Sequence, residues 1–260
     1  MANEPVVGID RNQEQMILDG VDSFIERDVK PYVSELEEQD IYPEDIVEKM
    51  KELGLFGATI SADYGGLGLP VTTYAKIIEK ISGAWMSVSG IINSHLIMAA
   101  AVERHGTTEQ KQSYLPRFAT GELRGGVALT ESDAGTDLQA IRTVAKREGN
   151  QGYRVNGSKM WITNSIQGNC LALLAKTDPK AEPRHKGMSL FIAEKGPGFE
   201  VSRKLKKLGY KGIDTAELVF NDYHIEADKL IGGEEGLGRR HVEPPVVRGR
   251  VRHHRNRAAF

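Results

Sequence analysis

The spacing of the apolar residues changes near residue 125, and this change constrains the fold more than any other feature of the sequence. From residue 11 to about residue 122, apolar side chains recur every three or four positions, as they do along one face of a helix. After Gly125 the apolar residues fall in short alternating segments that are rich in Val, Ile, Leu and aromatic residues. Such segments are typical of strands. The sequence therefore predicts an all-α part followed by an all-β part.

Local signals mark where the helices of the first part begin and end. Pro43 suits the first turn of a helix over EDIVEKMKEL, and Gly54 suits its C-terminal end. Thr107 and Gln110 have the spacing of a capping box, and Gly106 closes the helix before them. These signals and the apolar spacing predict about five helices.

The second part contains one dipeptide that is typical of a tight hairpin. Asn156-Gly157 lies between GYRV and SKMWITN, and this dipeptide favours a type I′ turn. Four more strand-like segments follow: CLALLAKTD, GMSLFIAEK, FEVSRKL and TAELVFNDYHI. Their spacing predicts an antiparallel barrel or sandwich.

Composition excludes several classes of protein. The chain of 260 residues has 34 Lys and Arg against 36 Asp and Glu, so it lacks the basic surplus of a nucleic-acid binder. Cys170 is the single cysteine, which excludes an intrachain disulfide and a multi-cysteine zinc site. The N-terminus lacks the pattern of a secretory signal, and the most apolar stretch, residues 91–102, suits a buried helix and not a membrane span. We therefore expect a cytoplasmic protein without membrane contact.

The last 22 residues differ in charge from the rest of the chain. They contain seven arginines and one acid, Glu243, and carry a net charge of +6, which leaves −8 for the other residues. The consecutive prolines Pro244 and Pro245 are incompatible with a regular helix there. This segment resembles the product of a shifted reading frame or a truncation, and the alternative is a natural basic tail for an acidic partner.

Common catalytic and nucleotide-binding motifs do not occur in the sequence. Residues 65–70 (GGLGLP) are rich in glycine but lack the G-x-G-x-x-G spacing of a dinucleotide site. The sequence has no Walker-type Gly-Lys-Ser/Thr, no H-E-x-x-H zinc motif and no G-x-S-x-G nucleophile elbow. The Rossmann, P-loop, zinc-enzyme and hydrolase interpretations therefore lose their main supports, and no metal site is expected.

Residues 128–140, ALTESDAGTDLQA, lie where the helices give way to strands, and they resemble the acyl-CoA dehydrogenase family. In that family a Leu/Met-Thr-Glu sequence is followed by a small residue, Gly, Ser/Thr and Asp. Four further motifs occur in the family's order: ADYGGLGL at 62–69, KMWITN at 159–164, KLGYKGIDTAELVFNDYHI at 207–225 and LIGGEEGLG at 230–238. Five ordered motifs are far more specific than any one of them alone.

The resemblance implies an α+β multidomain fold. Residues 1–124 would form an N-terminal all-α helical domain, and residues 125–234 a middle β domain, an antiparallel barrel or sandwich, that binds flavin and acyl-CoA. Residues 235–260 are interpreted as an aberrant or truncated basic tail in the place where the family has a C-terminal four-helix bundle.

The resemblance also implies FAD-dependent α,β-dehydrogenation of an acyl-CoA thioester. A glutamate removes the α proton, and the β hydrogen leaves as hydride to flavin N5. In the family this glutamate belongs to the C-terminal bundle, so no catalytic residue is identifiable in this sequence. We therefore expect little or no dehydrogenase activity from this chain.

The resemblance places a FAD site on two stretches of the chain. Thr130 and Thr163 would form hydrogen bonds with the polar edge of the flavin, and Trp161 would pack against its ring. Small residues at 134 and 135 would let the backbone approach the pyrophosphate, and Thr136 would donate to a phosphate oxygen and contact the acyl-CoA. The complete set is Val127, Leu129, Thr130, Ala134, Gly135, Thr136, Trp161, Ile162 and Thr163.

Several nearby residues have a structural interpretation. Asp137 is expected to cap local backbone amides, and Glu131 to make a structural hydrogen bond or ion pair, in preference to acid–base chemistry. Considered alone, Trp161 in a strand would more often be a core residue, but the ordered motifs reverse this. Cys170 is expected to be a small buried apolar residue. A solvated strand face, or else contact with a CoA phosphate, is expected for Lys204, Lys206 and Lys207.

The resemblance extends to partners and leaves alternatives open. It implies acyl-CoA as the substrate, electron-transfer flavoprotein as the electron acceptor, and a homotetramer or dimer as the assembly. The alternatives are a non-catalytic flavin-binding fragment or pseudoenzyme, and a related flavin monooxygenase or nitroalkane oxidase. The motifs ALTESDAGTD and WIT favour the dehydrogenase.

Overall fold

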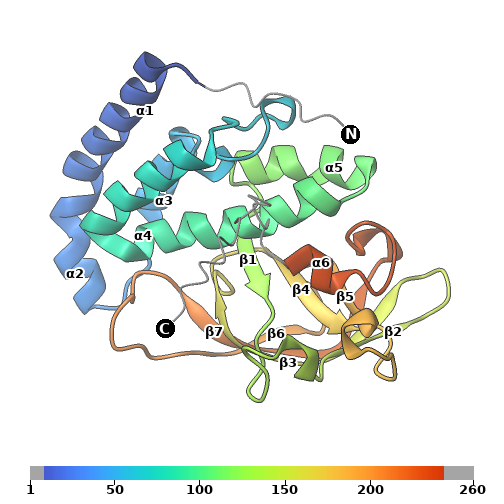
Figure 1. The fold of residues 1–260 in the computed structure, drawn as a ribbon. Coiled ribbons are helices and arrows are strands. Elements are labelled where there is room, and N and C mark those ends of the chain that lie inside the picture. The colour runs from blue at the N-terminus through green and yellow to red at the C-terminus, as the bar shows by residue number, and fades with distance from the viewer. Residues whose placement is uncertain (1–8, 243–260) are drawn as a thin grey trace, which may run out of the picture.

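A computed structural model describes residues 9–242 and shows a layer of helices packed on a sheet (Figure 1). Between residues 9 and 124 the structure has five α-helices, which confirms the expected number. They are α1 (Arg11–Phe24), α2 (Val33–Glu38), α3 (Glu44–Glu52), α4 (Val71–His105) and α5 (Thr108–Ala119). The order of helices and strands in the described residues confirms the predicted α part followed by a β part.

The helix ends follow the local signals in the sequence. The Gln110 amide donates to Thr107 Oγ1 over 3.2 Å, and the Thr107 amide donates to Gln110 Oε1 over 3.0 Å, which confirms the capping box. Gly106 caps the C-terminus of α4. Gly54 follows α3 with φ 69°, a left-handed conformation that favours glycine. Pro43 stands at the N-cap of α3, one position before the first turn.

Helix α4 is the apolar centre of the helical layer. Its backbone departs from helical geometry at Trp85 (φ −156°, ψ 107°), so it consists of two helical segments. Residues 91–102 are mostly buried, as predicted. Of the described helices, α4 alone is long and apolar enough to cross a membrane, but most of its apolar window is buried inside the protein. The cytoplasmic location stays a prediction.

Seven strands form one mixed sheet, in the order β1-β4-β2-β3-β7-β6 with β5 paired to β4. The strands are β1 (Gly125–Ala128), β2 (Val144–Arg147), β3 (Tyr153–Thr163), β4 (Cys170–Lys176), β5 (Met188–Glu194), β6 (Phe199–Lys204) and β7 (Thr215–Ile225). Strand β4 runs parallel to β1 and β2, while the other pairs are antiparallel. The sheet therefore departs from a purely antiparallel arrangement, because the chain passes through the β2–β3 pair between β1 and β4.

The predicted hairpin at Asn156-Gly157 is wrong, because both residues lie inside the continuous strand β3. The chain turns earlier, between Arg147 and Tyr153, where β2 pairs with β3. Gly157 has φ 148° and passes so close to Thr143 that a Cβ would lie 2.6 Å from the Thr143 Cα. The glycine therefore serves a close approach of two backbones and a register shift in the pairing with β7.

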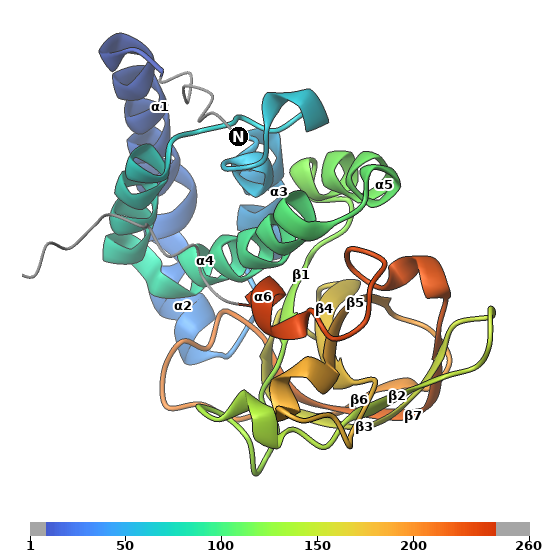
Figure 2. The ribbon, with the colours of Figure 1, turned by 45° about the vertical axis from the view of Figure 1, so that its right-hand side comes forward.

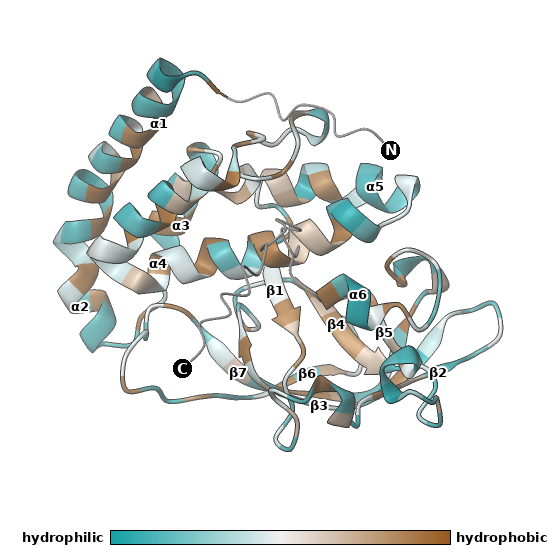
Figure 3. Cartoon of the chain, viewed as in Figure 1, coloured by the Kyte–Doolittle hydropathy of each residue, from teal (hydrophilic) through white to brown (hydrophobic). Residues whose placement is uncertain are grey.

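Strand β4 separates two hydrophobic clusters. Alternate side chains at Cys170, Ala172 and Leu174 belong to the cluster that includes the helices. The intervening side chains at 171, 173 and 175 belong to a second cluster with β3, β5 and β7. Figure 3 shows hydrophobic ribbon along α4, β1 and β4 and hydrophilic ribbon along much of α1. The strand is buried on both faces, which explains why its sequence is continuously apolar.

A short helix, α6 (Gly238–Val242), packs near β5 and α4 (Figure 2). It contains the first residues of the basic segment, and His241 is buried. Residues 243–260, on which the frameshift and tail interpretations depend, lie outside the described residues.

Candidate functional site

Residues 129–131, which follow β1, lie against strand β3. The Met160 amide donates to the Thr130 carbonyl oxygen over 2.9 Å. Lys159 Nζ donates to the Leu129 carbonyl oxygen, also over 2.9 Å. The two stretches that the sequence assigns to flavin binding are therefore neighbours in space.

The side chain of Trp161 is turned outward by an irregularity in β3. The pairing of β3 with β7 shifts between Lys159 and Ile162, which interrupts the alternation of side chains. Trp161 has φ 63° and is 58% exposed. A left-handed conformation is uncommon for a bulky residue, and such strain collects at functional sites. The strand therefore presents a broad aromatic face to solvent, so Trp161 is not a core residue.

Three threonine hydroxyls in the two predicted flavin-binding stretches have no hydrogen-bond partner among residues 9–242, those of Thr130, Thr136 and Thr163. Thr130 and Thr163 are half-buried, whereas Gly135 and Thr136 are exposed. A Cβ at Gly135 would meet no atom within 4 Å, so its backbone is open to a ligand. Free hydroxyls, exposed backbone and an exposed aromatic face on these two stretches suit the polar edge, the pyrophosphate and the ring of FAD. The residues present fit this cofactor.

The other predicted FAD-binding residues have different positions. Ala134 and Ile162 are buried, so their side chains pack in the core and only their backbones are available to a ligand. Val127 and Leu129 line a cavity between β1 and α4. The structure thus joins the two stretches at residues 129–131 and β3, and the nine side chains differ in their exposure.

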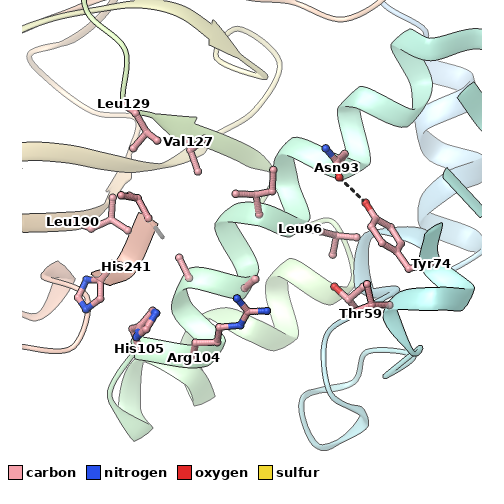
Figure 4. Close-up of a pocket in the computed structure, with 15 residues that line it drawn as sticks. Thr59, Tyr74, Asn93, Leu96, Arg104, His105, Val127, Leu129, Leu190 and His241 are labelled. Atoms are coloured by element: carbon pink, nitrogen blue, oxygen red, sulfur yellow. Dashed lines mark hydrogen bonds between the residues drawn. The ribbon is translucent and has the colours of Figure 1, made fainter. Parts of the chain in front are cut away.

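This cavity has a volume of about 440 Å³ and walls that are mainly apolar (Figure 4). The apolar residues that line it are Val71, Leu96, Ile97, Ala100, Ala101, Val127, Leu129, Leu190 and Val242. Tyr74 donates to Asn93 Oδ1 over 3.1 Å on one side. Arg104, His105 and His241 lie at another side. Such a space suits an apolar acyl chain better than a highly polar ligand.

A buried ion pair joins the segment after β1 to β3. Lys159 Nζ lies 2.9 Å from Glu131 Oε1, with the two side chains 0% and 8% exposed. Burial alone would raise the pKa of Glu131, but the Lys159 charge and hydrogen bonds to residues 142 and 143 hold it below its ordinary value. Burial lowers the pKa of Lys159 to about 8, against the opposing effect of Glu131. Both groups are therefore charged at neutral pH.

The ion pair confirms the structural interpretation of Glu131 and adds a residue that the sequence had not singled out. Lys159 belongs to the KMWITN motif. The feature of the sequence that could have pointed to it is a charged residue in a strand whose other inward-facing residues are apolar. Asp137 accepts from the Gln139 amide over 3.1 Å, which confirms its local capping role.

The remaining candidates have structural surroundings. Lys204 lies 2.9 Å from Asp40 at the surface. Lys207 is held inward, since its Nζ donates to the Ile213 carbonyl oxygen over 2.5 Å and to Thr215 Oγ1 over 3.0 Å. Cys170 is buried, which confirms the expected small buried residue, and burial raises the pKa of its thiol, so the thiol is unreactive. The described residues form no cluster that would hold a metal ion.

Family models for two consecutive domains match this chain. Residues 11–122 match the N-terminal domain of acyl-CoA dehydrogenases, and residues 126–223 match the middle domain. The short-chain specific acyl-CoA dehydrogenase of Clostridium acetobutylicum is 38% identical over 228 residues, which are 87% of this chain and 59% of that protein. The chain thus spans somewhat more than half the length of this relative.

Solved structures show the same similarity. An acyl-CoA dehydrogenase complexed with FAD from Bacillus anthracis has a TM-score of 0.81 and 33% identity, over 89% of this chain and 39% of that one. A structure described as the electron transferring flavoprotein of Acidaminococcus fermentans has a TM-score of 0.84 and 34% identity, over 90% of this chain and 61% of that one.

Proposed function

Because this chain belongs to the acyl-CoA dehydrogenase family, we propose that it binds FAD on the surface formed by residues 129–136 and Trp161–Thr163. The observation that carries the proposal is the exposed indole of Trp161, turned outward at a bulge in a strand that contacts the segment of Thr130, whose hydroxyl is unpaired. The comparisons support FAD as the cofactor, since one similar structure is described as a complex with it.

Each group on this surface has a role in holding the cofactor. The Trp161 face would exclude water from one side of the isoalloxazine ring. The hydroxyls of Thr130 and Thr163 would donate hydrogen bonds to its polar edge, and Gly135 and Thr136 would approach the pyrophosphate. Bound FAD supplies the hydride acceptor of the family's reaction.

The reaction that we propose for this site, once it is completed by the base that the resemblance assigns to a C-terminal bundle, is α,β-dehydrogenation of an acyl-CoA thioester. The apolar cavity between α4 and β1 supports this substrate class, because its walls suit a hydrocarbon chain and include Val127 and Leu129 from the same segment as Thr130. Neither Glu131 nor Asp137 supplies the base, because the first is held in an ion pair and the second caps an amide. The proton-abstracting glutamate is assigned by resemblance to the C-terminal part of the relatives, which the matched residues do not reach.

The partners follow from the same proposal. Electron-transfer flavoprotein is proposed as the electron acceptor, and the similarity to the Acidaminococcus fermentans structure supports it. A dimer or tetramer is proposed as the assembly, on the resemblance alone.

Titration with FAD tests the cofactor proposal. The flavin-free chain is expected to retain FAD through gel filtration, with a visible flavin absorbance at a fixed ratio to protein. Replacing Trp161 by leucine should raise the dissociation constant for FAD about 5-fold, since an aromatic contact of this kind contributes about 1 kcal/mol beyond buried area. Met16→Ala is the control, because Met16 is 74% exposed on α1. Absence of bound flavin at high FAD would refute the proposal.

A further inference from the structure

The ion pair between Lys159 and Glu131 differs from the other ion pairs of residues 9–242 in its burial. Each of the others has at least one partner that is more than a tenth exposed, whereas here the lysine is 0% and the glutamate 8% exposed. Removing two charges from water costs free energy that their attraction roughly offsets, so a buried pair contributes little net stability. The ion pair therefore matters more for the geometry that it fixes than for net stability.

The glutamate of this pair holds three segments together. Glu131 Oε2 accepts from the Arg142 amide over 2.6 Å, and Glu131 Oε1 accepts from the Thr143 amide over 3.0 Å, just before β2. The Glu131 backbone exchanges two hydrogen bonds with Ala134, over 2.8 and 3.2 Å, which closes the loop that leads to Gly135. The carboxylate thus joins residue 131 to the segment before β2, and the backbone of the same residue closes the loop.

The lysine fixes the same loop from the side of β3. Lys159 Nζ donates to the Leu129 carbonyl oxygen, one residue before Thr130. Two residues after Lys159, the chain turns at the bulge that exposes Trp161. The pair therefore lies between the two elements that present the threonine hydroxyl and the indole.

We propose that the buried Lys159–Glu131 pair positions the flavin-binding surface, by fixing residues 129–131 against β3 so that Thr130 and Trp161 can face one cofactor. This inference rests on the proposed function, and it adds two positioning residues that do not themselves touch the flavin. The Met160 amide, next to Lys159 in the chain, donates to the Thr130 carbonyl oxygen, so this hydrogen bond reports the same arrangement.

Two variants separate positioning from stability. Lys159→Met leaves Glu131 buried without a partner charge, which lowers the melting temperature. The double variant Lys159→Met/Glu131→Gln removes both charges, but the glutamine keeps one acceptor oxygen where Glu131 accepts from the Arg142 and Thr143 amides with two, so the melting temperature should recover in part. The affinity for FAD should not recover. We expect the dissociation constant for FAD to be about 10-fold or more above that of the parent in both variants. The bound flavin spectrum should shift in both.

A second measurement needs no cofactor. In flavin-free protein, hydrogen exchange of the Met160 amide should be about 10-fold faster in the double variant than in the parent, because its acceptor is no longer held in place. Gln110→Ala is the control for stability, since the buried Gln110 side chain bonds to the Asp228 and Leu230 carbonyl oxygens elsewhere in the fold. It should lower the melting temperature and leave FAD affinity unchanged.

The outcomes distinguish the two proposals. If the parent chain does not bind FAD, the proposed function fails, while the exchange of the Met160 amide still tests the positioning. If the parent binds FAD and the double variant binds it equally well, the positioning role is overturned. Recovery of FAD affinity in step with the melting temperature would also overturn it.

Discussion

Replacing Gly125 by alanine is expected to lower the free energy of unfolding by about 3 kcal/mol or more, because the new methyl group has no space. Gly125 is the first residue of β1 and pairs with Cys170 of β4 in a parallel register. A Cβ at this position would lie 1.5 Å from the Cys170 carbonyl oxygen. This obstacle is backbone in a strand that is buried on both faces, so it cannot swing aside as a side chain would.

Urea unfolding followed by far-UV circular dichroism measures this effect. Gly196→Ala is the matched control, because a Cβ there meets no atom within 4 Å and its backbone does not require a positive φ. The control should change the unfolding free energy by no more than about 0.5 kcal/mol. Equal midpoints for the two variants would contradict the packing that the structure shows between β1 and β4.

Acid is expected to destabilise the protein through His95, by about 3 kcal/mol between pH 6.5 and pH 4. His95 is fully buried on α4, against the edges of the Phe56 and Phe118 rings, and its Nε2 lies 3.1 Å from the Phe118 carbonyl oxygen. Burial lowers its pKa from 6.5 to about 4. In this pH window the unfolded chain binds a proton that the folded chain does not. The stability that is present above pH 6.5 is therefore lost as the pH falls toward 4.

His95→Gln isolates this contribution. The glutamine amide retains a donor for the Phe118 carbonyl oxygen but does not titrate. Burial also lowers the pKa of His241 to about 4, so the pH dependence of the parent's unfolding free energy includes both histidines. The difference in pH dependence between parent and variant therefore measures the contribution of His95. Between pH 7 and pH 4.5, the free energy of unfolding should decrease more in the parent than in the variant. Parallel pH profiles would show that His95 does not carry the loss.

The ordered motifs predict the candidate flavin site, but they do not show how its residues are arranged in space. The sequence around Trp161 was compatible with a core residue, and only the shift in pairing between β3 and β7 turns the indole outward. Lys159 carried no role in the sequence, because a lysine in a strand is usually solvated. Its role depends on Glu131, which is 28 residues away in the chain.

The sequence by itself determined the change from helices to strands, the capping box at Thr107, the burial of Cys170 and the two stretches that resemble a flavin site. These features depend on the spacing of residues along the chain and on local chemistry, both of which are visible in one dimension. The tertiary structure decided that Asn156-Gly157 lies inside a strand, that β4 runs parallel to β1 and β2, and that Lys159 pairs with Glu131. These outcomes depend on which backbones approach one another. Asn156-Gly157 favours a turn by itself, but in the folded chain Gly157 is needed where β3 passes close to Thr143.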